Sequence, residues 1–314
     1  MAPSVPAPLP APDSLAATGP LPLPRPAGGT FPAGLHVVER PWAPVAGAPA
    51  AGDAHAGAEP PPVVVLVHGS LDRAASFTRT MRRLPTTWRV LAYDRRGYQG
   101  SREGGVVGLT GHVEDLLDVA AATGRRVAAV GHSMGGVVVL AAAVARPTAF
   151  TAVGAFEPPV PWLGFGRDGA PLADVRAPDP GATAEAFFRR MAGDSAWDRL
   201  PETARTARRL DGPALATELA ALRRGAPAPF DIAALTVPAV FGSGGEVTEE
   251  RRRRAVAWLA ANVPGSRLVE IPAAGHGAHL THPGAFADFA AAVVALGAEG
   301  PAGEEPARRG GAGR

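Results

Sequence analysis

The sequence contains neither cysteine nor lysine, and Asn262 is its single asparagine. Without cysteine the chain can form no disulfide, offer no thiolate nucleophile and build no cysteine-based metal site. The apolar run 137–145 is far shorter than the ~20 residues that a membrane-spanning helix requires. The first residues lack a positively charged segment, and repeated proline interrupts any apolar core of the signal-peptide type. These absences favour a cytoplasmic protein.

Charged residues are also few, at 19% of the 314 residues against 46% hydrophobic. The isoelectric point near 9.8 accompanies a formal net charge of only +2, because every basic residue is arginine. The densest basic run, 251–254, follows Glu249 and Glu250 at the spacing of helical ion pairs, which indicates a solvated helix face. We therefore expect no nucleic-acid partner and no membrane partner. The sequence does not indicate an oligomeric state.

The composition divides the chain into a core, an insertion and two low-complexity ends. Residues 1–33, rich in proline and alanine, predict a disordered arm, and 298–314 predict a disordered tail. In 34–159 and 232–297, β-like runs alternate with helix-like runs, which predicts a mostly parallel central sheet with helices on both faces. The interval 160–231 has helix-like segments and no convincing strand. It is expected to form a helical lid.

Individual elements follow from hydrophobic patterning. Strands are expected in the runs PPVVVLVHGS, WRVLAYDRRG, RRVAAVG, FTAVGAFEPP, VPAVFG and SRLVEIP. Helices are expected in HVEDLLDVAAAT and GGVVVLAAAVA, and within the insertion at 184–191, 197–210 and 214–224. The aromatic residues of the insertion either line a substrate pocket or attach the insertion to the core; they are Trp162, Phe165, Phe187, Phe188 and Trp197.

The segment VGHSMGGVVV places Ser133 between glycines, after a predicted strand and before a predicted helix. A neutral serine hydroxyl is a poor nucleophile, so it needs a base within reach and a third group that orients the base. The strand–turn–helix context identifies the G-x-S-x-G pattern as a nucleophile elbow, with helix N–H groups available to a developing anion. Ser133 is therefore the predicted nucleophile. The alternative is a tight turn without chemistry.

Four stretches, LVHGS, YDRRGYQGS, GHSMGG and PAAGHGAHLTHPGAF, resemble the α/β-hydrolase family in content and order over about residues 34–297. The resemblance implies an α/β-hydrolase fold with a small lid inserted after the strand that follows the nucleophile helix. It also implies an oxyanion hole formed by the backbone N–H groups of Ser70 and Met134, with His276 as the base and His279 packed beneath its loop. The candidate substrate-binding residues are Leu71, His132, Trp162 and Phe165.

The acid of the catalytic triad departs from the common family pattern. Relatives carry an aspartate in the loop after the strand VPAVFG, where this chain has FGSGGEVTEE and Glu246 as the nearest carboxylate. A second position known in the family is the end of the strand after the nucleophile helix. There, GAFEPP places Glu157, 24 residues after Ser133. We favour Glu157 as the acid, and Glu246 is the alternative.

Three histidines, His276, His279 and His282, recur at a spacing of three without an acidic or cysteine ligand beside them. This pattern does not indicate a metal site, and no metal or cofactor is expected. The sequence predicts a cofactor-independent serine hydrolase that cleaves carboxylic esters, lactones or thioesters, with a small molecule as its substrate. One alternative is an acyltransferase or perhydrolase with the same triad. The other is a non-catalytic ligand-binding protein of this fold.

Overall fold

The computed structural model of the chain describes residues 31–32, 34–40, 61–165, 179–222, 227–246 and 250–299. The expected arm and tail lie outside these residues except for their innermost positions, and so does the stretch 166–178 of the insertion. In the described part of the chain, no helix has the length and apolar character needed to cross a membrane.

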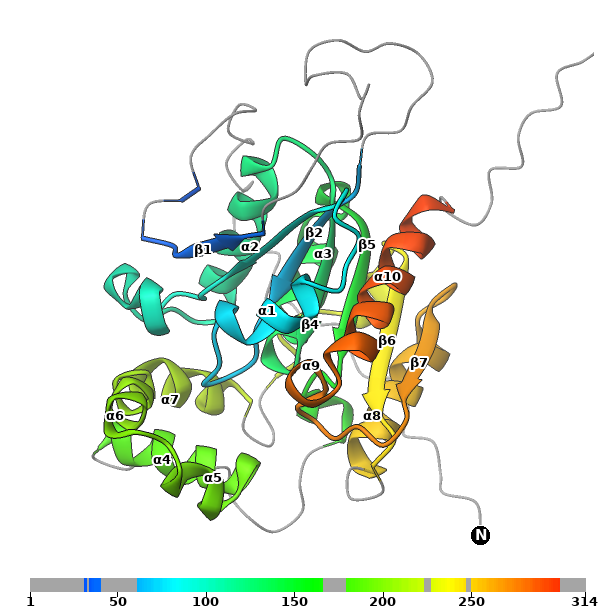
Figure 1. The fold of residues 1–314 in the computed structure, drawn as a ribbon. Helices are drawn as coiled ribbons and strands as arrows, with labels where there is room; N and C mark the ends of the chain where they lie inside the picture. The colour runs from blue at the N-terminus through cyan, green and yellow to red at the C-terminus, as the bar shows by residue number, and fades with distance from the viewer. Residues whose placement is uncertain are drawn as a thin grey trace, which may run out of the picture.

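A seven-stranded sheet, in the order β1-β3-β2-β4-β5-β6-β7, forms the centre of the described structure (Figure 1). All neighbouring strands are parallel except β1, which runs antiparallel to β3 at one edge. The six strands expected from the sequence are confirmed. The sequence did not predict β1, because a strand of three residues is too short to show a pattern. The strands are β1 (Val37–Glu39), β2 (Val63–Val67), β3 (Arg89–Tyr93), β4 (Val127–His132), β5 (Phe150–Phe156), β6 (Ala239–Gly244) and β7 (Arg267–Ile271).

Helices cover both faces of the sheet (Figure 1). One face packs against α2, α3 and α8, and the other packs against α1, α9 and α10. The helices are α1 (Thr78–Met81), α2 (Leu109–Ala122), α3 (Met134–Ala145), α4 (Pro180–Ala192), α5 (Asp194–Asp198), α6 (Glu202–Leu210), α7 (Gly212–Ala221), α8 (Glu250–Asn262), α9 (Ala278–Thr281) and α10 (Pro283–Ala298). Short 3-10 helices are η1 (Ala74–Phe77), η2 (Gln99–Gly104), η3 (Pro147–Ala149), η4 (Pro161–Leu163) and η5 (Ile232–Ala234).

The central strands are apolar throughout because helices cover both faces of the sheet. Every residue of β2 is buried: Val63, Val65 and Val67 face the α2–α3 side, while Val64 and Leu66 face the α10 side. A strand that is buried on both faces has no polar alternation, as is usual in parallel sheets. Helix α3 contacts β4, β5 and α2 and is buried over most of its length. This packing fixes the turn that enters α3.

The described residues of the insertion form four α-helices, α4 to α7, and no strand. The expectation of one helix over 197–210 was wrong: α5 ends at Asp198 and α6 begins at Glu202. The break occurs because Pro201, in an extended conformation, cannot continue a helix. Figure 1 shows α4 to α7 at the end of the sheet toward which the parallel strands point.

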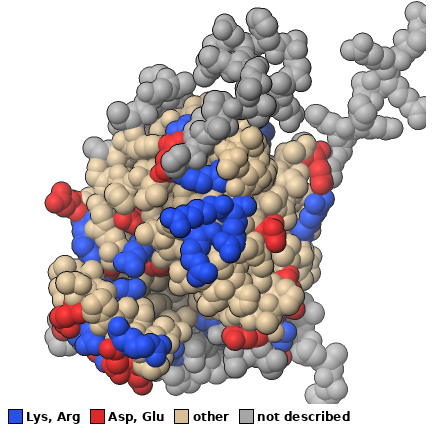
Figure 2. All heavy atoms as spheres, viewed as in Figure 1, with Lys and Arg blue, Asp and Glu red and all other residues tan. Residues whose placement is uncertain are grey.

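The outer surface of these helices carries both signs of charge (Figure 2). Glu185 pairs with Arg189 and with Arg209 across α4 and α6. Inside, Trp197 is buried, and its ring lies 5.4 Å from that of Phe188. The helices therefore have a small core of their own. A surface hollow of about 380 Å³ lies among α4, α6 and α7, outside the residues predicted to perform catalysis.

Candidate active site

Five loops that follow parallel strands meet at the carboxyl edge of the sheet. They carry Ser70 after β2, Ser133 after β4, Glu157 after β5, Glu246 after β6 and His276 after β7. In open α/β sheets this edge is where ligands bind, because the loops there project from a rigid scaffold. The topology therefore brings the predicted nucleophile, base, oxyanion hole and both candidate acids to one edge.

Ser133 occupies the sharp turn between β4 and α3, with φ 53° and ψ −123°. A residue with a side chain adopts this region only under strain, which is typical of a nucleophile elbow. The Ser133 N–H donates to the Phe156 carbonyl over 2.8 Å, and this bond ties the turn to the adjacent strand. A methyl group at Gly135 would overlap the carbonyl oxygens of Val67 and His68, so only glycine lets α3 approach the sheet so closely.

Glu157 and His276 are joined by a hydrogen bond. Glu157 Oε2 lies 2.6 Å from His276 Nδ1, and Glu157 Oε1 accepts from the Gly244 N–H over 2.9 Å. The Glu157 side chain is fully buried, whereas His276 retains some exposure. A carboxylate accepts the Nδ1 proton, so His276 Nε2 carries the lone pair that a general base requires.

Glu246 makes no hydrogen bond with His276 among the described residues. Its backbone N–H donates to the Ala274 carbonyl over 3.1 Å, and its exposed side chain lies beside Gly275. Of the two candidate acids, the structure brings only Glu157 into hydrogen-bond contact with His276.

Ser133 Oγ and His276 are not hydrogen-bonded in the described structure. Catalytic hydrogen bonds are often long without substrate and shorten when substrate binds. His276 nevertheless lies close to the elbow, because its carbonyl oxygen is 2.7 Å from Nε2 of His132, the residue before Ser133. The rings of His132 and His276 have centroids 4.6 Å apart.

The predicted oxyanion donors are Ser70 and Met134. Neither of their backbone N–H groups donates to another described residue, so both are available to a ligand. The two loops lie close together, since a Cβ added at Gly69 would stand 3.0 Å from that of Ser133. Met134 is also the first residue of α3, where the helix dipole favours negative charge. These N–H groups suit the stabilisation of an oxyanion.

Positive charge beside the histidine affects its protonation. Burial lowers the pKa of His276 well below its usual value, and Arg252 and Arg251 lower it further. Burial raises the pKa of Glu157. Arg252, whose Nε lies 3.8 Å from Oε2, lowers this pKa and so opposes the effect of burial. The expectation that 251–254 forms only a solvated face was therefore wrong, because α8 begins beside the end of β5. Arg251 donates to the Phe165 carbonyl, whereas Arg254 is exposed.

The lowered pKa of His276 predicts how activity depends on pH. A general base must be neutral, and a lowered pKa keeps His276 neutral at more acidic pH. We expect kcat/KM to remain constant as the pH falls past 6.5, the usual histidine pKa, and to decline only at lower pH. A pH–rate profile with a hydrolysed ester checks this. An acidic limb centred at or above 6.5 would contradict it.

Sequence reasoning missed a buried ion pair that ties α7 of the insertion to the loop that carries Ser70. Glu218 of α7 accepts from Arg95 at one oxygen and from Ser70 Oγ, over 2.6 Å, at the other. Arg95 in turn donates to the carbonyls of His68 (3.0 Å) and Gly69 (2.9 Å). Both charged side chains are fully or almost fully buried. The pair holds the loop that carries the Ser70 N–H.

Removing one partner of a buried ion pair leaves the other charge uncompensated. We expect Glu218→Gln to lower the free energy of unfolding by about 3–5 kcal/mol, because Arg95 has no solvent to replace its partner. Urea denaturation measures this. Glu202→Gln, which removes a partner of Arg209 from an exposed pair, is the control and should change stability little. Equal stability of Glu218→Gln and the unmodified protein would contradict the account.

The candidate substrate-binding residues lie in different surroundings. Leu71, with φ 55°, packs against Leu215 and Leu219 of α7 and so anchors the insertion. Trp162 and Phe165 pack against the main core, with ring contacts to Phe230 and Trp258 respectively. These contacts favour attachment of the insertion to the core. Substrate contact by Leu71, His132, Trp162 and Phe165 stays a prediction.

A sequence model of the alpha/beta hydrolase family matches residues 64–289. That range covers most of the chain and includes Ser133, Glu157 and His276. The chain belongs to the alpha/beta hydrolase family. No curated protein matches the sequence of this hydrolase.

Solved structures share the fold of this alpha/beta hydrolase at low identity. A thermophilic esterase from Thermogutta terrifontis is 20% identical, with a TM-score of 0.60 over 84% of this chain and 93% of that one. The enol-lactonase from Burkholderia xenovorans LB400 is 21% identical, with a TM-score of 0.59 over 83% and 96%. A bromoperoxidase from Bacillus anthracis is 20% identical, with a TM-score of 0.59 over 75% and 92%. At these identities the likeness concerns the fold.

Proposed function

We propose that this alpha/beta hydrolase is a cofactor-independent serine hydrolase that cleaves carboxylic esters, lactones or thioesters through an acyl-enzyme on Ser133. The observation that carries the proposal is the 2.6 Å hydrogen bond between Glu157 and His276, next to a serine in a strained turn. A buried carboxylate, a histidine and a serine at the end of a strand form the constellation that activates a hydroxyl.

The proposed reaction has two halves. Ser133 Oγ attacks the substrate carbonyl while His276 Nε2 takes the hydroxyl proton, and the N–H groups of Ser70 and Met134 bind the oxyanion. Glu157 stabilises the imidazolium. His276 then protonates the leaving group, and the acyl group remains on Ser133. Water, deprotonated by His276, attacks the acyl-enzyme, and His276 returns that proton to Ser133 Oγ as the carboxylic acid is released.

A substrate panel tests this function. The panel contains nitrophenyl esters of increasing acyl length, lactones and acyl-thioesters, with simple esters and lactones first because two structural neighbours are named an esterase and an enol-lactonase. We expect turnover of at least one class by the unmodified protein and none by Ser133→Ala. Folded protein without turnover of any class would contradict the proposal, as would turnover retained by Ser133→Ala.

The same panel separates the alternatives. An acyltransferase or perhydrolase uses the same acyl-enzyme but passes the acyl group to an alcohol or to hydrogen peroxide instead of water. Product formed mainly from such an acceptor would identify that reaction. The lid role of α4 to α7 and the cytoplasmic location stay predictions.

A further inference from the structure

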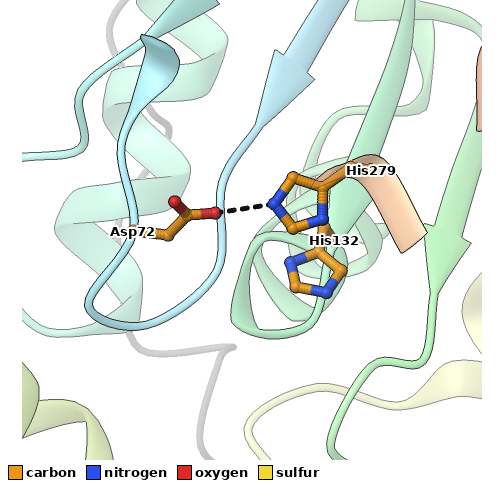
Figure 3. Close-up of side chains that lie close together, drawn as sticks. All are labelled: Asp72, His132 and His279. Carbon is orange, nitrogen blue, oxygen red and sulfur yellow. Dashed lines mark hydrogen bonds and ion pairs between the residues drawn. The ribbon is translucent and has the colours of Figure 1, made fainter. Parts of the chain in front are cut away.

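Beside the proposed base, three side chains from separate parts of the chain converge: Asp72 after β2, His132 at the end of β4 and His279 in α9 (Figure 3). One potential ligand atom of each lies within 4.8 Å of those of the other two. His279 Nε2 and Asp72 Oδ2 are 3.0 Å apart, and the rings of His132 and His279 have centroids 4.2 Å apart. None of these side chains takes part in the proposed hydrolytic steps.

His132 contributes an unshared lone pair. Its Nε2 lies 2.7 Å from the His276 carbonyl oxygen, and because a carbonyl only accepts, Nε2 carries the proton. In a neutral imidazole only one nitrogen carries the proton, so with Nε2–H donating to that carbonyl, Nδ1 is a bare acceptor. The residue is only 6% exposed, and Nδ1 has no hydrogen-bond partner. Figure 3 shows one of its ring nitrogens on the side of Asp72.

Asp72 contributes negative charge. Its carboxylate oxygens accept hydrogen bonds from His279 Nε2 and Ser76 Oγ, which favour the charged form. Ser76 Oγ donates to Oδ1, which orients Oδ2 toward His279. The Asp72 side chain is partly exposed, so an ion can reach it from solvent. Arg208 interacts with the Asp72 charge and offsets part of the attraction for a cation.

We propose that Asp72, His132 and His279 form a binding site for a divalent first-row transition ion such as Zn²⁺. Two imidazole nitrogens and a carboxylate oxygen suit these ions, whereas Mg²⁺ and Ca²⁺ take oxygen ligands. Ligand atoms about 2.1 Å from Zn²⁺ lie roughly 3.4 Å from one another, so a pair at the 4.8 Å limit must close by about 1.4 Å. The His279 proton moves from Nε2 to Nδ1, which has no hydrogen-bond partner.

Two of the proposed ligand residues already have hydrogen-bond partners that orient them. The His276 carbonyl orients His132, and Ser76 orients Asp72, as outer partners commonly do at metal sites. The sequence predicted no metal because the three late histidines lack an acidic neighbour. The fold supplies that acid from 207 positions away, and it uses only His279 of the three. His276 is instead bonded to Glu157.

Binding of an ion at this site would affect the position of the proposed base, His276. His132 directly precedes Ser133, and it hydrogen-bonds the backbone of His276. An ion that draws His132 toward Asp72 strains that bond and displaces His276. We expect the ion to inhibit hydrolysis. This consequence rests on the proposed function, whereas the binding does not.

The test uses the full chain after removal of metal by a chelator. Co²⁺ is titrated while its visible absorption is recorded, and Zn²⁺ is titrated by calorimetry. We expect a single site for which the two ions compete. Asp72→Asn and His279→Gln each remove a ligand and should weaken binding by at least the about 10–100-fold that loss of an outer partner costs. His282→Gln changes a histidine of the same loop outside the cluster and should bind as the unmodified chain does.

Failure of the folded, unmodified chain to bind Co²⁺ stoichiometrically would overturn the site. Equal affinity of the unmodified chain and Asp72→Asn would overturn it as well. Asp72→Asn preserves side-chain size, so it decides the outcome if His279→Gln does not fold. Zn²⁺ should inhibit ester hydrolysis by the unmodified chain at concentrations that leave Asp72→Asn unaffected. Binding without inhibition would refute the displacement of His276.

Discussion

Replacing His276 with alanine is expected to reduce kcat by about 10⁵–10⁶-fold, the loss typical when the base of a serine–histidine pair is removed. Without the imidazole, the Ser133 hydroxyl has no group that takes its proton, and the leaving group has no acid. The Ser70 and Met134 N–H groups remain, so residual activity above the uncatalysed rate is expected. Steady-state kinetics with the best ester of the panel measures the effect.

The matched control is His282→Ala. His282 belongs to the same loop, but its ring nitrogen is bonded to Thr281 Oγ1 at 2.9 Å and not to Glu157. We expect its kcat to remain close to that of the unmodified protein. Comparable losses of kcat in His276→Ala and His282→Ala, with unchanged melting temperatures, would contradict the assignment of the base.

Replacing Glu157 with glutamine is expected to reduce kcat by about 10⁴-fold. The amide keeps the size of the side chain but carries no charge to stabilise the imidazolium. It can also donate to Nδ1, which would favour the tautomer with its proton on Nε2, the wrong one for a base. The 2.6 Å bond and the burial of Glu157 make both effects strong. Kinetics and urea denaturation should be measured on the same preparation.

Glu246→Gln is the control for the acid. Glu246 lies in the loop where relatives carry their aspartate, but its exposed side chain makes no hydrogen bond with His276 in the described structure. We expect kcat to change little. A large loss in Glu246→Gln together with near-normal kcat in Glu157→Gln would reverse the assignment. Near-normal kcat in both would refute the triad.

The central part of the fold could be predicted because burial on both faces leaves a clear pattern. The runs around β2 and β4 are apolar without interruption and end at glycine, so both strands were evident. The edge strand β1 has three residues, none of them fully buried, which leaves no such pattern. In the insertion, Pro201 is visible in the sequence, but the helical spacing on both sides concealed the break.

The candidate site, too, could be predicted only in part. Ser133 and His276 stand in local motifs, and Glu157 could be located by its distance from Ser133 and its place at the end of a strand. The Arg95–Glu218 pair joins residues 123 positions apart, and neither lies in a motif that names its partner. Such contacts depend on how the insertion docks on the sheet.

The central claim is that Ser133 is an activated nucleophile, and covalent labelling tests it most directly. A fluorophosphonate probe, which reacts with activated serine hydroxyls, is incubated with the folded protein, and the product is analysed by intact mass and peptide mapping. We predict a single adduct, located on Ser133, and no adduct in Ser133→Ala. An unlabelled folded protein, or an adduct that persists in Ser133→Ala, would contradict the account.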